Sequence, residues 1–297
     1  MNESISKVPC VPKVPYQKYH GYQKYHESEI RELGFEFIEL LVPEPEDRLN
    51  LRELRKCLEV NQLDVLLAAR VNLQRSICSE DATNQKTGHA YLKYCLKVAN
   101  ELGAKIIGGP IYGEPLVFAG RAPYPWTAEE MNRRAERMIE GLSVAAEAAR
   151  MEGKIFAVEP LNRFETDLLN TTNQAIELVD LVNNDGLGLL LDTFHMNMED
   201  ASLVESIKKA GSRIVHFQAN ENHRGYLGSG SLPLKDVIRA LREIQYDGPI
   251  SLEPFRRNDE RLALPIAHWR QPDKDQLPKL QDSLQLIRST LNSSGQE

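Results

Sequence analysis

Four polar side chains in this sequence each follow directly on a short apolar run, and the four runs come one after another. The four are Glu159, Asp192, Gln218 and Glu253. A buried strand has no need of a carboxylate, so such groups at the same end of consecutive strands are hard to explain by folding alone. In a barrel of parallel strands those ends converge on one cup, where catalytic residues usually sit. Carboxylates gathered there repel one another unless a cation holds them together, and a divalent metal is the natural candidate.

The apolar runs alternate with helical segments from Leu33 onward. Strands are expected at Phe35–Val42, Val65–Ala69, Lys105–Gly109, Ile155–Val158, Leu187–Leu191, Ile214–Phe217 and Pro249–Leu252. Helices are expected at Leu49–Asn61, Thr87–Leu102, Thr127–Glu152, Asn173–Val182, Ala201–Ala210, Pro233–Ile244 and Leu280–Leu291. This alternation is typical of βαβ units in a parallel sheet. It favours an α/β fold, a closed (β/α)8 TIM barrel, and no GxGxxG follows the first strand to support a nucleotide-binding sheet.

The N-terminal segment, residues 1–30, fits this barrel less well. The only candidate for a strand before Phe35 is the stretch 8–15, which contains three prolines. Proline cannot donate to a strand ladder, so a central strand should not contain it. Residues 16–26 then read YQKYH, glycine and YQKYH again. We expect an irregular first strand and a polar, aromatic loop that enters a helix, within one domain spanning residues 1–297.

Composition excludes some classes of protein. A length of 297 residues suits a single-domain barrel. The net charge of -7 argues against a nucleic-acid surface. No apolar stretch is long enough to span a bilayer, and the first residues lack a signal-peptide core. The four cysteines show no CxxC spacing. We therefore expect a cytoplasmic protein with reduced thiols and without a membrane or nucleic-acid partner.

Two long motifs carry a resemblance to a known family. Residues 159–165 read EPLNRFE and residues 191–197 read LDTFHMN. Shorter matches are NHR at 222–224, GSGSLP at 228–233, YDGPISLEPF at 246–255 and HWR at 268–270. Together they resemble the ketose 3-epimerases, the D-tagatose and D-psicose 3-epimerase family of the xylose isomerase-like TIM-barrel superfamily. The resemblance covers the chain from Leu33 to its last helix, and it implies metal-dependent chemistry on a small sugar and assembly into dimers or tetramers.

The resemblance implies roles for the strand-ending carboxylates. Glu159, Asp192 and Glu253 match the metal-binding carboxylates of the family, and Glu159 and Glu253 also match its acid/base pair. The chemistry agrees with this assignment. Moving a proton at the carbon beside a ketone requires a Lewis acid on the carbonyl oxygen, which stabilises the developing enediolate. Epimerisation also requires one group on each face of that carbon, one to remove the proton and one to return a proton.

Three further residues match family positions that contact sugar oxygens beside the metal: Glu165, His195 and Arg224. His195 follows Asp192 by three residues, where it could bond a hydroxyl. Arg224 stands in a glycine-containing loop that we expect to be flexible enough to fold over a substrate. Three aromatic residues after the strand at 105–109 could select the far end of the sugar, or they could be core or interface residues, and these readings stay open: Tyr112, Tyr124 and Trp126.

The sequence departs from the family at one ligand position. The family has a metal-binding histidine where this chain has Gln218. His216 lies two residues earlier, on the same side of the strand but about 6–7 Å deeper. We expect Gln218 to bind the metal through its amide oxygen. The all-oxygen ligand set then favours Mn²⁺ or Mg²⁺, with Co²⁺ as another candidate, and Mn²⁺ is our first expectation.

These residues predict a metal-dependent sugar isomerase or epimerase that acts at C3 of a ketose or keto-sugar through a cis-enediolate. A dehydratase or lyase acting on a keto-sugar or 3-keto-glycoside would use the same acid/base pair for a β-elimination. The endonucleases of the superfamily use a histidine-rich cup, whereas the seven histidines here are spread through an acidic chain. A sugar-binding barrel without catalytic activity is the remaining alternative.

Overall fold

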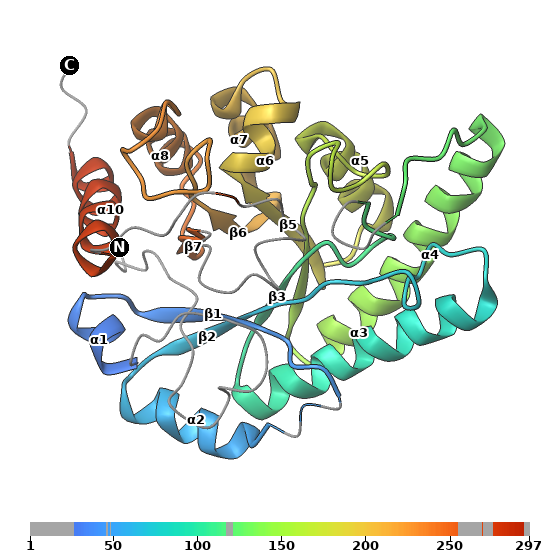
Figure 1. Ribbon diagram of the computed structural model, residues 1–297, viewed down its shortest axis with the longest axis horizontal. Coiled ribbons are helices and arrows are strands. Elements are labelled where there is room, and N and C mark those ends of the chain that lie inside the picture. Colours follow the sequence, from blue (N-terminus) through green and yellow to red (C-terminus); the bar gives the residue numbers. More distant parts are fainter. Residues whose placement is uncertain are drawn as a thin grey trace.

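Parallel strands follow one another in chain order in the computed structural model, which describes residues 27–45, 47, 49–116, 121–254, 269 and 276–293. The strands are β1 (Phe37–Leu41), β2 (Asp64–Ala68), β3 (Ile106–Gly109), β4 (Ile155–Val158), β5 (Leu187–Asp192), β6 (Ile214–Gln218) and β7 (Ile250–Ser251). The sheet curves into a nearly closed barrel with helices around it (Figure 1). This confirms the predicted α/β TIM-barrel fold. The first strand expected at residues 8–15 lies outside the described residues.

Helices alternate with the strands and cover the outside of the sheet. They are α1 (Glu27–Glu32), α2 (Leu51–Val60), α3 (Ala82–Leu102), α4 (Ala128–Met151), α5 (Thr172–Val182), α6 (Thr193–Glu199), α7 (Leu203–Ala210), α8 (Leu234–Glu243) and α10 (Gln276–Asn292), with a short 3-10 helix, η3 (Gly211–Arg213). The strongly amphipathic α8 shows how they attach, because its apolar side chains are buried while its charged face is exposed. The predicted strand–helix alternation is confirmed throughout this region.

Two helices depart from the prediction for reasons of capping. We expected α3 to begin at Thr87, but it begins at Ala82 because the Asp81 carboxylate accepts hydrogen bonds from the first turn, including 2.7 Å from the Thr83 N–H. The short helix α6 was not predicted at all. It starts directly after β5, where Asp192 caps it by accepting from the Phe194 N–H at 2.8 Å. One of the predicted metal ligands is thus also a helix cap.

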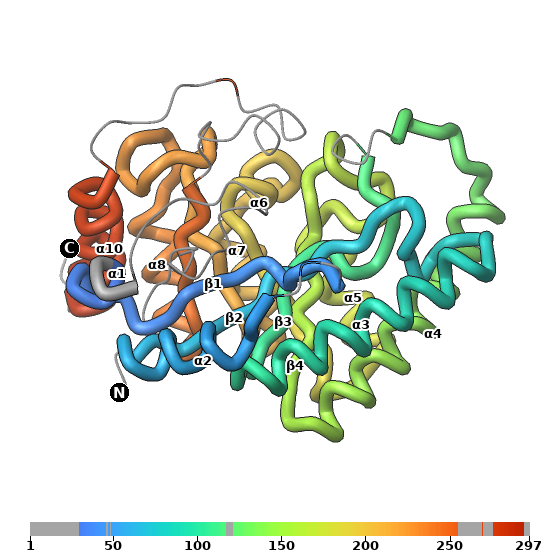
Figure 2. Tube along the Cα trace, turned by 60° about the horizontal axis from the view of Figure 1, so that its bottom comes forward, coloured from blue at the N-terminus to red at the C-terminus, as the bar shows by residue number. Residues whose placement is uncertain are grey.

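The two ends of the described chain meet beside the barrel. Figures 1 and 2 show α10 next to α1. Arg288 of α10 donates a hydrogen bond of 2.7 Å to the carbonyl of Gly34, which follows α1. Leu280, Leu284 and Ile287 of α10 are buried in the core. The C-terminal helix therefore braces the segment that leads into β1.

Gly109 ends β3 at the rim of the cup and supplies a stability test. Its φ is +128°, and a Cβ built on it would lie 2.1 Å from the carbonyl oxygen of Ala69. We expect Gly109→Ala to lower the free energy of unfolding by about 1–3 kcal/mol through overpacking, on top of the strained φ. Gly103→Ala is the control, because Gly103 also has a positive φ (+81°) but has nothing within 4 Å of the added Cβ. Urea unfolding of both variants measures the difference, and equal losses would contradict the steric argument.

Candidate metal centre and active site

The predicted residues converge on a cavity at the carboxyl ends of the strands. Its volume is about 140 Å³. The polar side chains that line it are Glu39, Arg70, Glu159, Glu165, His195, Gln218, Arg224 and Glu253. Asp192 is 1% exposed, and its carboxylate lies next to Arg224 and His195 of this group. The structure therefore brings together the seven residues that the sequence predicted as metal ligands, acid/base groups and sugar contacts.

Asp192 has one carboxylate oxygen committed to the fold and one available. Its Oδ1 accepts from the Phe194 N–H at 2.8 Å and from the Asn220 side-chain amide at 2.9 Å. Its Oδ2 is buried and accepts no hydrogen bond from the described residues. Asn220 also accepts from the Glu253 N–H at 3.0 Å through its own side-chain oxygen, so it ties two of the predicted ligands together. The sequence analysis did not single out Asn220.

Gln218 lies beside Asp192, since the two residues are register partners of β6 and β5. The Gln218 Nε2 donates to both carboxylate oxygens of Glu39, at 3.0 and 3.2 Å. Its Oε1 is buried and accepts no hydrogen bond from the part of the chain that the structure describes. Glu39 was missed in the sequence analysis. The signal was available, because Glu39 is a carboxylate in the middle of the apolar strand Phe37–Leu41.

His216 occupies the layer below, as its spacing from Gln218 predicted. It is fully buried, and its Nε2 lies 2.8 Å from the Ser251 hydroxyl and 3.6 Å from Glu39 Oε2. It does not line the cavity. His216 is thus positioned to support the floor of the cup rather than to bind a ligand in it.

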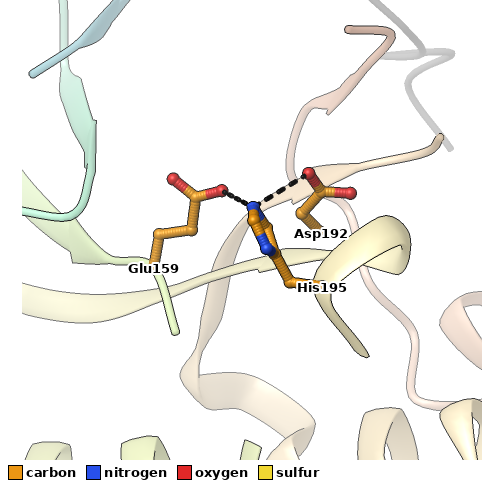
Figure 3. A group of neighbouring side chains, drawn as sticks. All are labelled: Glu159, Asp192 and His195. Atoms are coloured by element: carbon orange, nitrogen blue, oxygen red, sulfur yellow. Dashed lines mark ion pairs between the residues drawn. The ribbon is translucent and has the colours of Figure 1, made fainter. Parts of the chain in front are cut away.

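The donor atoms in the cup fit a hard divalent cation. Asp192 Oδ2 and Gln218 Oε1 are buried oxygens without a hydrogen-bond donor among the described residues. Glu159 and Asp192 also present carboxylate oxygens that lie with His195 Nε2 within 4.8 Å of one another (Figure 3). Carboxylate and amide oxygens are preferred ligands of Mg²⁺ and Mn²⁺. The cup is therefore a candidate site for a divalent metal.

His195 contacts a hydrogen-bond donor at each of its ring nitrogens. The backbone N–H of Asn162 donates to Nδ1 at 3.0 Å, and one Arg224 Nη, which can only donate, lies 2.7 Å from Nε2. Burial and the nearby Arg224 cation lower the pKa of His195 well below its usual value, so the ring is neutral. A neutral imidazole carries one N–H and one acceptor nitrogen, so it accepts from only one of these two donors at a time. Nε2 also lies 3.6 Å from Glu159 Oε1 and 3.8 Å from Asp192 Oδ2, beside the candidate cation site.

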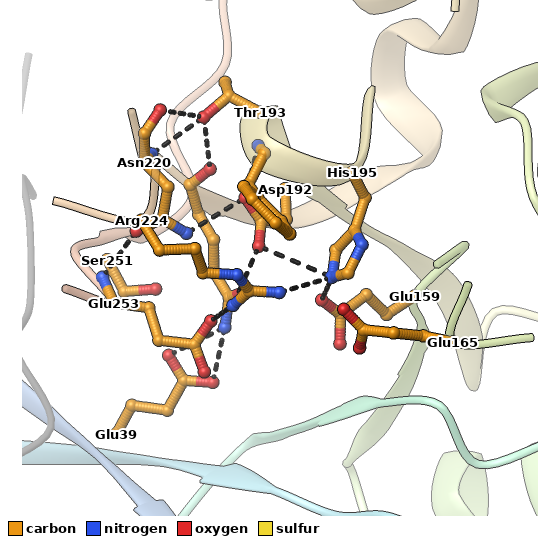
Figure 4. Close-up of polar contacts among 12 residues, drawn as sticks. Glu39, Glu159, Glu165, Asp192, Thr193, His195, Asn220, Arg224, Ser251 and Glu253 are labelled. Atoms are coloured by element: carbon orange, nitrogen blue, oxygen red, sulfur yellow. Dashed lines mark hydrogen bonds and ion pairs between the residues drawn. The ribbon is translucent and has the colours of Figure 1, made fainter. Parts of the chain in front are cut away.

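Arg224 lies inside the cup, in the loop that we expect to fold over a substrate. It is only 6% exposed, and its guanidinium packs 4.2 Å from the centre of the Phe194 ring. One Nη donates to Glu253 Oε2 and lies 3.6 Å from Asp192 Oδ2, while the other lies 2.7 Å from His195 Nε2 (Figure 4). The residue has a φ of +57°, a left-handed conformation that side chains with a Cβ rarely adopt. Packing and ion pairing hold it there.

The two proposed acid/base carboxylates lie on opposite sides of the Arg224 guanidinium (Figure 4). Burial, followed by repulsion from Glu253 and Asp192, raises the pKa of Glu159 well above its usual value. Burial also raises the pKa of Glu253 to about 8, against the opposing effect of Arg224. A general acid or base works best when its pKa lies near the operating pH. The pKa of Glu253 thus lies near neutrality, and burial shifts the pKa of Glu159 in the same direction.

Glu165 borders the cavity, whereas the three aromatic residues do not. Asn162 donates to Glu165 Oε1 at 2.8 Å, and burial raises the pKa of Glu165. Tyr112 is fully buried and donates to the carbonyl of Glu159 at 3.0 Å, so it belongs to the core. Tyr124 is exposed and Trp126 packs on Arg134, outside the cavity. The apolar lining comes instead from Leu41, Ala68, Ala69, Pro110, Leu161 and Leu190.

Comparison with known proteins places this arrangement among sugar epimerases. The family profile described as "Xylose isomerase-like TIM barrel" matches residues 28–289. A D-psicose 3-epimerase of Enterocloster bolteae is 30% identical over 260 residues, covering 86% of this chain and 83% of that protein. An L-ribulose 3-epimerase of Mesorhizobium japonicum is 30% identical over 246 residues, covering 82% and 80%.

A solved structure gives the same likeness in three dimensions. The D-psicose 3-epimerase of Clostridium cellulolyticum H10 with D-tagatose superposes with a TM-score of 0.84 at 26% identity, covering 97% of this chain and all of that one. These matches confirm the resemblance seen in the EPLNRFE and LDTFHMN motifs. Within the described residues, no helix combines the length and the apolar character needed to cross a membrane.

Proposed function

We propose that this chain, which belongs to the xylose isomerase-like TIM barrel family, is a divalent-metal-dependent epimerase acting at C3 of a ketose or keto-sugar. The observation that carries the proposal is the placement of two carboxyls with raised pKa, Glu159 and Glu253, on opposite sides of one buried cup. Its relatives named as D-psicose and L-ribulose 3-epimerases support the same reaction class. Epimerisation at C3 by proton transfer needs no redox cofactor.

Four residues would hold the metal: Glu159, Asp192, Gln218 and Glu253. The bound ion would supply Lewis-acid stabilisation of negative charge on the substrate oxygens during proton transfer. The buried oxygens of Asp192 and Gln218 that lack hydrogen-bond donors among the described residues support this set. We infer Mn²⁺ as the native ion from the all-oxygen donors. We also propose a cytoplasmic location from the cysteine usage, and assembly into dimers or tetramers from the family resemblance. Metal analysis and light scattering of the purified protein would check the ion and the assembly.

Proton transfer requires the two glutamates in opposite states. One carboxylate removes the C3 proton from one face of the sugar, and the electron pair moves toward the C2 carbonyl oxygen to give the enediolate. The other, protonated carboxyl then returns a proton to the opposite face. Burial raises the pKa of Glu159 and of Glu253, so that each carboxyl can hold a proton and release it during turnover. Each turnover leaves the protonation of the pair reversed.

His195 and Arg224 supply donors for the substrate oxygens. One Arg224 Nη lies 2.7 Å from His195 Nε2, so no atom fits between them in this arrangement. A sugar hydroxyl or carbonyl would replace that contact, accepting from Arg224 and from His195 in its Nε2–H tautomer. Arg224 must then release Glu253, to which it donates a hydrogen bond, before that carboxylate can act as a base. Glu165, on the border of the cavity, would accept from a sugar hydroxyl.

Incubation of the Mn²⁺-loaded protein in D₂O with D-psicose, D-tagatose and L-ribulose tests the proposal directly. Epimerisation places deuterium at C3 without loss of mass from the sugar. An elimination would release water or, from a 3-keto-glycoside, the aglycone. If no ketose or keto-sugar exchanges its C3 proton with solvent, the proposed function is wrong.

Gln218 is the residue whose replacement should change the metal preference. We expect Gln218→His to strengthen binding of Co²⁺ and Zn²⁺ relative to Mn²⁺, because an imidazole nitrogen replaces an amide oxygen in the ligand set. Competition titrations with pairs of these ions would measure the ratio of dissociation constants in both proteins. An unchanged ratio would mean that Gln218 does not bind the ion.

A further inference from the structure

We propose that Glu39 is a positioning residue that holds the amide of Gln218 with its oxygen toward the metal. This inference rests on the proposed function, because it assigns a role to Glu39 in the same metal centre. Glu39 lies on β1 and Gln218 on β6, so their contact spans the inside of the barrel between residues 179 apart in the sequence. None of the sequence motifs that suggested the site includes Glu39.

The contact is buried and made through both carboxylate oxygens. Glu39 is 4% exposed and Gln218 is 3% exposed. The Gln218 Nε2 donates to Glu39 Oε1 at 3.0 Å and to Oε2 at 3.2 Å. His216, whose Nε2 lies 3.6 Å from Glu39 Oε2, backs the carboxylate from below. Glu39 therefore has a defined place and a defined partner.

Because the two ends of an amide group differ, this contact also determines which atom of Gln218 points away from Glu39. A glutamine side chain has one acceptor oxygen and one NH₂ donor, and rotation about its last bond exchanges them. In the flipped orientation, Gln218 would turn its oxygen toward the Glu39 carboxylate and its N–H groups toward the cation. Both contacts would be repulsive. An ionised Glu39 thus permits one orientation, which leaves Gln218 Oε1 buried without a donor among the described residues, on a side chain that lines the cavity.

A chain with a histidine at position 218 would not need this arrangement to present a ligand atom of the right kind. Either nitrogen of a neutral imidazole can serve as a metal ligand. An amide has only one suitable atom, its oxygen, so a glutamine at this position needs a neighbour that fixes its orientation. Glu39 does this by accepting from Nε2. Outer partners that orient metal ligands typically affect metal affinity by about 10–100-fold.

Titration of Mn²⁺ alone into the metal-free full-length protein tests the proposal without relying on catalysis. We expect Glu39→Gln to weaken Mn²⁺ binding by about 10–100-fold, because a glutamine at 39 can face either end of the Gln218 amide. Glu39→Asp, which keeps the charge but withdraws it by one methylene, should also weaken binding. Glu53→Gln removes an exposed carboxylate on α2 and is the matched control, expected to leave the affinity unchanged. Thermal unfolding of each metal-free variant verifies that it is folded.

The same substitutions in a Gln218→Ala background separate positioning from simple loss of charge. With the amide removed, Glu39→Gln should change the Mn²⁺ dissociation constant by no more than about twofold, the usual limit for independent sites. A loss of the same size in both backgrounds would show that Glu39 acts only through its charge and would overturn the inference. So would full Mn²⁺ affinity in both Glu39→Gln and Glu39→Asp. If the unsubstituted chain binds no Mn²⁺, the proposed function fails, and the inference fails with it.

Discussion

Glu253→Gln should reduce C3 epimerisation by about 10²–10⁴-fold, the usual contribution of a general acid or base. Glutamine preserves the volume of the side chain and an oxygen that can face the metal, but it cannot take a proton from carbon. We therefore expect Mn²⁺ binding to persist while turnover is lost. Epimerisation of a ketose by chromatography and Mn²⁺ titration of the same preparation would measure the two effects.

Solvent exchange adds a more specific expectation. In the two-base mechanism each glutamate faces one of the two C3 epimers. Glu253→Gln should leave deuterium exchange only for the epimer whose proton faces Glu159, and Glu159→Gln should show the opposite preference. Glu177→Gln, an exposed substitution on α5, is the control and should retain exchange of both epimers. Exchange of both epimers in Glu253→Gln would contradict the assignment of two bases.

Removing the metal should abolish activity and reverse the usual pH dependence of stability. In the metal-free cup, burial raises the pKa of Glu159, of Asp192 and of Glu253, the last to about 8. A carboxyl whose pKa is raised in the folded state binds its proton more tightly there than in the unfolded chain. The stability linked to that proton is complete below the unfolded pKa of about 4 and is lost as pH rises through the folded value. The melting temperature in chelator should thus fall between about pH 5 and pH 8.

Adding Mn²⁺ should counter this decline, since the ion binds the deprotonated carboxylates. At a free concentration of 100 times its dissociation constant, a ligand adds about 2.7 kcal/mol to the free energy of unfolding. Scanning calorimetry with chelator and with Mn²⁺ across this pH range would measure both effects. Glu253→Gln is the control, because it removes one of the titrating groups and should flatten the decline in chelator. A melting temperature that rises with pH in chelator would contradict the shifted pKa values.

The position of the site could be predicted from the sequence because it follows from the strand ends. Glu159, Asp192, Gln218 and Glu253 each follow a short apolar run, and parallel strands bring such positions together. The barrel follows from the same alternation. The start of α3 was missed because the expectation relied on Thr87 and overlooked the capping side chain of Asp81. Caps depend on single polar residues and not on periodicity.

Contacts across the barrel could not be predicted in the same way. The pairing of Glu39 with Gln218 depends on which face of β1 points into the barrel and on the position of β1 relative to β6. Arg224 was expected in a flexible loop because three glycines follow it, but the ion pairs of its guanidinium with Glu253 and Asp192 in the cup were not predicted. Local composition describes the freedom of a loop in isolation. It does not include the charges that the rest of the fold presents to it.

The buried position of Arg224 bears on the order of events when the protein matures. A newly made chain must close a cavity rich in carboxylates before any ion is bound in it, and unpaired buried charges oppose that closure. The Arg224 guanidinium, next to Glu253 and Asp192, provides an internal counter-charge at this stage. Folding can then be completed first and the ion acquired afterwards, through exchange with a side chain that is already in place. Under that order, the ion that a cell supplies in greatest excess has an advantage, and the occupancy of the centre reflects the metal supply as well as intrinsic affinity.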